Sequence, residues 1–146
     1  MLRMDRRTLL AGLGAGAIAS AMTGVELGAQ TGASASGTVY ELRVYHLAEG
    51  KLDLILARFR DHTIALFNKH GIKSVAYWSP MDEPLAGRTI FYMLEHPSRE
   101  QAEANWKSFR TDPEWKTLQA TTEADGKWEL KIETTFLKKA SFSPGL

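Results

Sequence analysis

The chain has 146 residues, of which 44% are hydrophobic and 24% are charged, and these values are typical of one globular domain of ordinary size. Its formal net charge of +1 gives no basis for nucleic acid as an obligatory partner. The sequence contains no cysteine, which excludes disulfides, thiolate metal sites and cysteine nucleophiles.

The N-terminus has the pattern of a twin-arginine export signal. Arg6 and Arg7 are followed by an uncharged stretch, residues 8–25, that is rich in glycine and alanine. This stretch is near the lower length limit for a membrane span but is weakly apolar, so a cleaved signal is favoured over a retained anchor. Candidate cleavage sites follow Ala29 and Ala35.

The sequence therefore divides into a signal peptide at residues 1–29, a flexible linker at residues 30–37 and one mature domain at residues 38–146. Loss of the signal removes three basic and two acidic residues and leaves equal numbers of each. We expect an exported, periplasmic protein that contacts the membrane only transiently during export and does not bind nucleic acid.

The mature domain begins with an alternating segment. Residues 38–47 predict a half-buried strand in which Glu41, Arg43 and Tyr45 share one face. Residues 51–70 predict a helix, because their apolar side chains recur at helical spacing, and the glycine that follows suits a left-handed position beyond its C-terminus.

The second half of the domain repeats this order of elements. Three further segments have strand character, namely residues 72–79, 88–96 and 130–138. Ser98 and Gln101 have the spacing of a capping box at the start of a second helix. Asp112 and Pro113 predict another helix start, with a short helix that ends near Thr122.

The order of elements, β-α-β-β-α-β, predicts an α+β fold of the ferredoxin-like split βαβ type, a four-stranded antiparallel sheet with helices on one face. We expect Glu41, Arg43 and Tyr45 on the bare face. A face that carries aromatic and charged side chains rarely stays open to water. Two such sheets are therefore expected to close into a dimeric α/β barrel around a polar and aromatic cavity, the alternative being a monomer with a solvated sheet.

Four stretches of the sequence resemble the NIPSNAP family, namely YELRVY, GKLDLILARFRDHTIALFNKHGIKSVAYW, TDPEWKTL and ETTFLKKASFSP. The resemblance covers residues 39–144 and implies a dimeric α/β barrel of ferredoxin-like subunits. It implies no single activity. Members are described as mitochondrial scaffold-like proteins and as uncharacterised bacterial proteins, while the wider barrel superfamily includes small monooxygenases, haem-degrading enzymes and decarboxylase-like proteins. The predicted export signal of this chain argues against a mitochondrial role.

Four residues are candidates for catalysis, namely Glu41, Arg43, Tyr45 and His62. Arg43 could hold a carboxylate or enolate while Glu41 or Tyr45 moves a proton. The alternative is a Glu41–Arg43 ion pair in a cross-strand ladder or dimer seam. His62 lies at the edge of the apolar stripe of the first helix and could act as a general base. Its alternative is a partly buried structural histidine.

The two histidines of the first helix do not form a metal site. His62 and His70 are eight residues apart, or about 12 Å of helical rise, which is too far for two ligands of one ion. His70 is expected to be structural, because it lies in the last turn, where the helix dipole favours a cation.

Aromatic residues provide the candidates for ligand binding. Tyr77, Trp78 and Tyr92 could line a pocket for a flat apolar molecule, or they could pack in an interface. Trp106 and Trp115 fall on helical stripes and are expected in the core.

The sequence carries no phosphate loop, dinucleotide fingerprint or carboxylate metal cluster, so neither a cofactor nor a metal is expected. The favoured interpretation is an exported homodimeric barrel that binds a small organic molecule, with cofactor-independent monooxygenase-like chemistry as its candidate activity. The alternative is a non-catalytic structural or interaction module that uses the barrel only to dimerise.

Overall fold

The computed structural model describes residues 37–145. The predicted export signal and nearly all of the predicted linker lie outside these residues. No helix in the described part of the chain is long and apolar enough to cross a membrane. In chain order the elements are β1 (Val39–Leu47), α1 (Leu52–Arg58), the π-helical turn η1 (Phe59–Thr63), α2 (Ile64–Lys69), β2 (Lys73–Trp78), β3 (Thr89–His96), α3 (Arg99–Thr111), α4 (Pro113–Thr122) and β4 (Glu129–Leu137).

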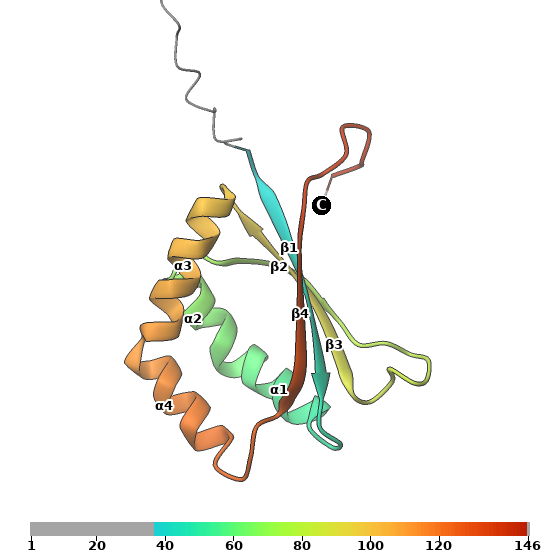
Figure 1. The fold of residues 1–146 in the computed structure, drawn as a ribbon, viewed down its shortest axis with the longest axis vertical. Helices are drawn as coiled ribbons and strands as arrows, with labels where there is room; N and C mark the ends of the chain where they lie inside the picture. The colour runs from blue at the N-terminus through green and yellow to red at the C-terminus, as the bar shows by residue number, and fades with distance from the viewer. Residues whose placement is uncertain (1–36, 146) are drawn as a thin grey trace, which may run out of the picture. The chain divides into compact units, whose positions relative to one another are not determined.

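The strands form one antiparallel sheet in the order β2-β3-β1-β4. The helices lie together on one side of this sheet, as Figure 1 shows. This arrangement confirms the predicted ferredoxin-like α+β fold, and each predicted strand matches an observed one within one or two residues. The two central strands, β1 and β3, pair along almost their whole length and form the floor on which the helices pack.

The core lies between the sheet and the helices. On β3, alternate residues are buried, and Ile90, Tyr92 and Leu94 are fully enclosed beneath the helical layer. Ile55 and Phe67 meet them from the helices. Burial of side chains of this size stabilises the fold by about 1.5–3 kcal/mol each.

The other face of the sheet is not covered by any described element. Apart from the buried Thr89 at one end, its residues are half-buried or exposed. Its apolar centre is formed by Leu42, Val44, Phe91 and Met93, together with Trp78 of the edge strand β2. Charged residues lie at its edges, where Lys73 pairs with Glu95 at 3.0 Å.

The structure corrects the face assigned to the first strand. Glu41, Arg43 and Tyr45 do share one face, but that face is covered by the helices, and Glu41 is only 1% exposed. A buried carboxylate is tolerated here because three side chains, those of Arg43, His96 and Trp106, donate hydrogen bonds to it. Alternation in the sequence shows only which residues of a strand share a face. Whether a charged residue on that face can be buried depends on its hydrogen-bond partners.

The predicted first helix is present, but it contains a π-helical turn. The Ile64 N–H donates to the Phe59 carbonyl, which is an i to i+5 hydrogen bond. The helix ends as predicted. Gly71 has a φ of 72°, and the Ile72 N–H donates to the Phe67 carbonyl at 2.9 Å.

The predicted helix starts of the second half are confirmed in part. The Ser98 hydroxyl accepts from the Gln101 N–H at 3.1 Å, but the Gln101 side chain donates to Asn105 and does not reach back, so the capping box is incomplete. Asp112 caps α4 by accepting from a backbone N–H. The imidazole of His70 joins α2 to this junction through a 2.6 Å contact with Asp112, which is a structural role as expected.

Candidate functional site

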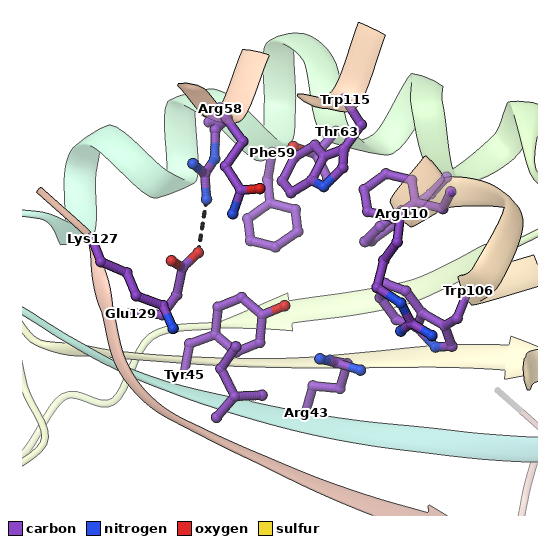
Figure 2. Close-up of a pocket in the computed structure, with 14 residues that line it drawn as sticks. Arg43, Tyr45, Arg58, Phe59, Thr63, Trp106, Arg110, Trp115, Lys127 and Glu129 are labelled. Carbon is purple, nitrogen blue, oxygen red and sulfur yellow. Dashed lines mark hydrogen bonds and ion pairs between the residues drawn. The ribbon is translucent and has the colours of Figure 1, made fainter. Parts of the chain in front are cut away.

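A cavity of about 310 Å³ lies between the sheet and the helices (Figure 2). Strands β1 and β4 supply its floor, α1, η1 and α2 its roof, and α3 and α4 its side. Its apolar lining is mainly aromatic, namely Tyr45, Phe59, Phe67, Trp106, Phe109, Trp115 and Ile132. A largely apolar hollow of this size with a few polar groups is typical of a small-molecule site.

Arg43 is the charged group of the cavity floor. Its Nη1 donates to Glu41 Oε1 at 2.8 Å, and its guanidinium carbon lies 4.4 Å from the ring centre of Trp106. Burial opposes its charge, but Tyr92, Tyr45 and Glu41 outweigh that effect and raise the pKa of Arg43 above its ordinary value. Its Nε is buried and has no hydrogen-bond partner in the described part of the chain. Arg43 is therefore an ionised group with unused donor capacity beside the cavity.

Glu41 lies behind Arg43 and does not line the cavity. Its Oε2 accepts from His96 Nε2 at 2.9 Å and from Trp106 Nε1 at 2.7 Å. Burial raises the pKa of Glu41, but the hydrogen bonds from His96, Trp106 and Arg43 more than compensate, and the net pKa is lowered. Both carboxylate oxygens are occupied, so Glu41 is placed to orient Arg43 and Trp106.

Tyr45 brings a hydroxyl to the cavity. The Tyr92 hydroxyl donates to the Tyr45 oxygen at 2.6 Å, which leaves the Tyr45 proton available to another acceptor. In Figure 2 this hydroxyl points toward the side on which Phe59 and Arg43 lie. Burial raises the pKa of Tyr92 well above its ordinary value, so Tyr92 stays protonated as the donor.

The three aromatic residues expected to bind a ligand do not line the cavity. Tyr92 is fully buried behind Tyr45, and Tyr77 stacks on Tyr92 with ring centres 5.4 Å apart. Burial raises the pKa of Tyr77 to about 12. Trp78 is 49% exposed on the uncovered face of the sheet. Two of the three residues therefore support Tyr45 from behind, and the third belongs to another surface.

Arg58 is a second arginine in the cavity wall, and both of its terminal nitrogens are paired. It is 5% exposed, its Nη1 donates to Glu123 at 2.5 Å and to Thr122 at 3.1 Å, and its Nη2 donates to Glu129 at 2.7 Å. These contacts join α1 to the end of α4 and to the start of β4. Figure 2 shows the contact with Glu129.

Thr63 contributes a hydroxyl to the roof. Its side chain is only 2% exposed, and Oγ1 has no hydrogen-bond partner among residues 37–145. Buried hydroxyls are normally hydrogen-bonded, so this one is an exception.

Two exposed cations stand at the rim of the cavity, Arg110 from α3 and Lys127 from the segment before β4. Neither has an ion pair within residues 37–145. Because the carboxylates nearest the cavity are already paired with Arg43 and Arg58, the free charge around it is positive.

His62 does not contribute to this cavity. It is exposed and lines an open groove between α2 and α4 with Leu66, Pro113 and Leu118 among others. Within η1 it is the neighbouring Thr63 that lines the cavity. In the described residues, no group of three His, Cys, Asp or Glu side chains could hold a metal ion.

Most of the helical half of the site was missed by sequence reasoning. Trp106 was expected in the core and lies there, and Trp115 packs against it, but both also line the cavity. Two signals were available. Thr63 is a hydroxyl within an otherwise apolar helical stripe, and Trp106 and Arg110 have the i, i+4 spacing that puts both on one helix face.

The fold and this cavity define a ferredoxin-like α+β domain with a ligand-sized hollow between its layers. The NIPSNAP family model matches residues 40–144, and the chain belongs to the NIPSNAP family. The predicted resemblance is thereby confirmed. No curated protein gives a significant match.

Three solved structures illustrate the likeness of fold. An uncharacterised NIPSNAP-like domain protein from Burkholderia xenovorans is 17% identical, with a TM-score of 0.65 over 76% of this chain and 92% of that one. A NIPSNAP family protein of unknown function from Agrobacterium tumefaciens is 23% identical, with a TM-score of 0.63 over 75% and 95%. A Streptomyces coelicolor monooxygenase in complex with nanaomycin D is 11% identical, with a TM-score of 0.51 over 75% and 95%. At these identities the likeness shows the fold alone.

Proposed function

We propose that the chain binds a small, flat organic molecule in the cavity between its sheet and its helices. The observation that carries this proposal is an aromatic hollow of about 310 Å³ whose buried polar atoms, Arg43 Nε and Thr63 Oγ1, have no partner within residues 37–145. Aromatic walls favour a ring system, and unpaired polar atoms favour a ligand that supplies their missing hydrogen bonds.

Intrinsic fluorescence and thermal unfolding test this proposal, because Trp106 and Trp115 line the cavity. Fused-ring aromatic compounds are expected to quench the tryptophan fluorescence and to raise the Tm. Ile132 lines the cavity but is 42% exposed, so Ile132→Trp is expected to fill the hollow with little cost to the core. Equal binding to the wild type and to Ile132→Trp would place the ligand elsewhere and contradict the proposal.

Cofactor-independent oxygenation of the bound molecule is the activity that we propose for this site. The support is the fold shared with a monooxygenase that binds nanaomycin D, together with Arg43 and Tyr45 in one cavity. Arg43 would stabilise an ionised substrate, and the Tyr45 hydroxyl would exchange a proton with it. Oxygen consumption with enolisable aromatic substrates tests this activity. Binding of such substrates without oxygen consumption would show that the protein binds them but does not oxygenate them.

Homodimerisation through the uncovered face of the sheet is the second part of the proposal. That face carries the apolar centre formed by Leu42, Val44, Trp78, Phe91 and Met93. Closing two such faces would remove these side chains from water. Phe91→Glu is expected to convert the dimer to a monomer in light scattering. A wild-type monomer at micromolar concentration would refute the dimer.

The same face supports a second candidate function, a non-catalytic module that uses the barrel only to assemble. The two functions differ in the cavity. If the protein is such a module, Ile132→Trp would leave its assembly unchanged, and only Phe91→Glu would disrupt that assembly.

Export by the twin-arginine pathway is also proposed, on the sequence pattern alone. Replacement of Arg6 and Arg7 by lysine is expected to retain the uncleaved precursor in the cytoplasm. The intact mass of the exported wild type would show whether cleavage follows Ala29 or Ala35.

A further inference from the structure

Two buried polar groups line the cavity from opposite layers of the fold. Arg43 Nε belongs to β1 in the floor, and Thr63 Oγ1 belongs to η1 in the roof. Both atoms are shielded from solvent and lack a hydrogen-bond partner within residues 37–145. A buried polar group without a partner lowers the stability of the fold, and a ligand that hydrogen-bonds to both groups would remove that cost.

The chemistry of these groups limits the ligand. Arg43 is a donor only, and of its nitrogens only Nη1 has a partner in the described part of the chain. The Tyr45 hydroxyl already accepts from Tyr92, so it too faces the cavity as a donor. An acceptor that bears negative charge fits these two donors, one of which is a guanidinium, better than a neutral acceptor does.

Charge at the opening points the same way. Arg110 and Lys127 line the rim, and neither has an ion pair within residues 37–145. Free cations at the mouth of a cavity attract anions and raise their rate of entry.

The π-helical turn is the local feature that supplies Thr63. The hydrogen bond from Ile64 to Phe59 widens the turn by one residue, and both ends of η1, Phe59 and Thr63, line the cavity. Single π-turns inside α-helices occur often at functional sites. The hydroxyl is thus presented beside an aromatic ring on the same turn.

We propose that the cavity selects an aromatic carboxylate that carries a second oxygen substituent. The carboxylate accepts from Arg43 and Tyr45, the ring packs against Phe59 and Trp106, and the second oxygen bonds to the Thr63 hydroxyl. This inference rests on the proposed function, because it names the class of molecule that the cavity holds.

Three probes of nearly equal shape test the proposal by calorimetry on the full chain, namely 6-hydroxy-2-naphthoate, its amide 6-hydroxy-2-naphthamide, and 2-naphthoate. The hydroxy acid is expected to bind about tenfold or more tightly than its amide, because only the acid places a charge on Arg43. In Arg43→Gln this preference is expected to disappear. If the amide binds as tightly as the acid, the proposal is wrong while the proposed function stands. If none of the three binds, both fail together.

Substitutions at Thr63 separate a ligand-binding role from a structural one. Thr63→Val removes the hydroxyl with little change of shape. It is expected to lower the affinity for the hydroxy acid by about fivefold and to leave the affinity for 2-naphthoate unchanged. Thr63→Ser is expected to restore the affinity. Because the hydroxyl has no partner among residues 37–145, Thr63→Val should not lower the Tm.

Thr89 provides a matched control. Its hydroxyl is also buried without a partner within residues 37–145, at 0% exposure, but it does not line the cavity. Thr89→Val is expected to leave the affinity for all three probes unchanged and the Tm no lower than in the wild type. Equal affinity of Thr63→Val and the wild type for the hydroxy acid would overturn the role of Thr63.

Discussion

Two arginines line the same cavity, and their surroundings differ. Arg58 donates to two carboxylates and a hydroxyl, from Glu123, Glu129 and Thr122. Arg43 donates to one carboxylate, Glu41, and its Nε has no partner within residues 37–145. The two guanidiniums are chemically identical, so the difference lies in what the fold has placed around them.

The difference indicates that Arg58 stabilises the fold, whereas Arg43 is positioned to bind a ligand. The partners of Arg58 come from α4, from the residue after it and from β4, so its contacts close one end of the domain. The partners of Arg43 lie behind it or stack against it, through Glu41, Trp106 and Tyr45. They fix the guanidinium and leave donors directed elsewhere, which is the arrangement that preorganised binding requires.

The largest effect is expected for Arg58→Gln. The substitution leaves the Glu129 and Glu123 carboxylates buried without their cation, and breaking a buried pair in this way costs about 3–5 kcal/mol of the free energy of unfolding. Urea denaturation measures the loss. Arg60→Gln is the control on the same helical segment, because Arg60 is exposed and pairs only with its neighbour Asp61, and no measurable loss is expected there. Equal losses in the two variants would contradict a structural role for Arg58.

A smaller effect, with a distinct pH dependence, is expected for Glu41→Gln. Burial raises the pKa of Glu41, but hydrogen bonds from His96, Trp106 and Arg43 lower it below the ordinary value of 4.5. A carboxyl whose pKa is lowered in the folded state stabilises the fold above its unfolded pKa and loses that contribution as the pH falls through its folded pKa. Glu41→Gln is therefore expected to cost about 2 kcal/mol near pH 7 and less below pH 4.

Denaturation curves at several pH values check this result. The stability of the wild type should fall toward that of Glu41→Gln as the medium becomes more acidic. A gap that is constant from pH 7 to pH 3 would show that folding does not lower the pKa of Glu41, and the positioning of Arg43 by charge would then be wrong.

The grouping of Glu41, Arg43 and Tyr45 on one face follows from the sequence alone, because strand periodicity depends only on the backbone. The face to which they belong does not follow from it. His96 and Trp106, which satisfy Glu41, lie far along the chain, and only the folded sheet brings them to it. A charged side chain is predicted to be exposed unless such partners are known.

The same limit applies to the helical half of the cavity. The stripe that contains Phe59 and Thr63 was predicted correctly as the inward side of the helix, and all of the fold class could be derived from such periodicities. A residue that lines a cavity has the same periodicity as one that fills a core. Trp106 and Trp115 therefore could not be told apart from packing residues until the hollow between the layers was seen.

The smallest effect on stability is expected for Arg43→Gln, and it tests the comparison most directly. Glu41 keeps its hydrogen bonds from His96 and Trp106, and the substitution also removes the unpartnered Nε, so the loss should be only about 1 kcal/mol. Ligand affinity should fall far more than stability does. In Arg58→Gln the proportions should be reversed. A loss of stability in Arg43→Gln as large as that in Arg58→Gln would mean that both arginines are structural, because a group reserved for a ligand contributes little to the fold until the ligand is bound.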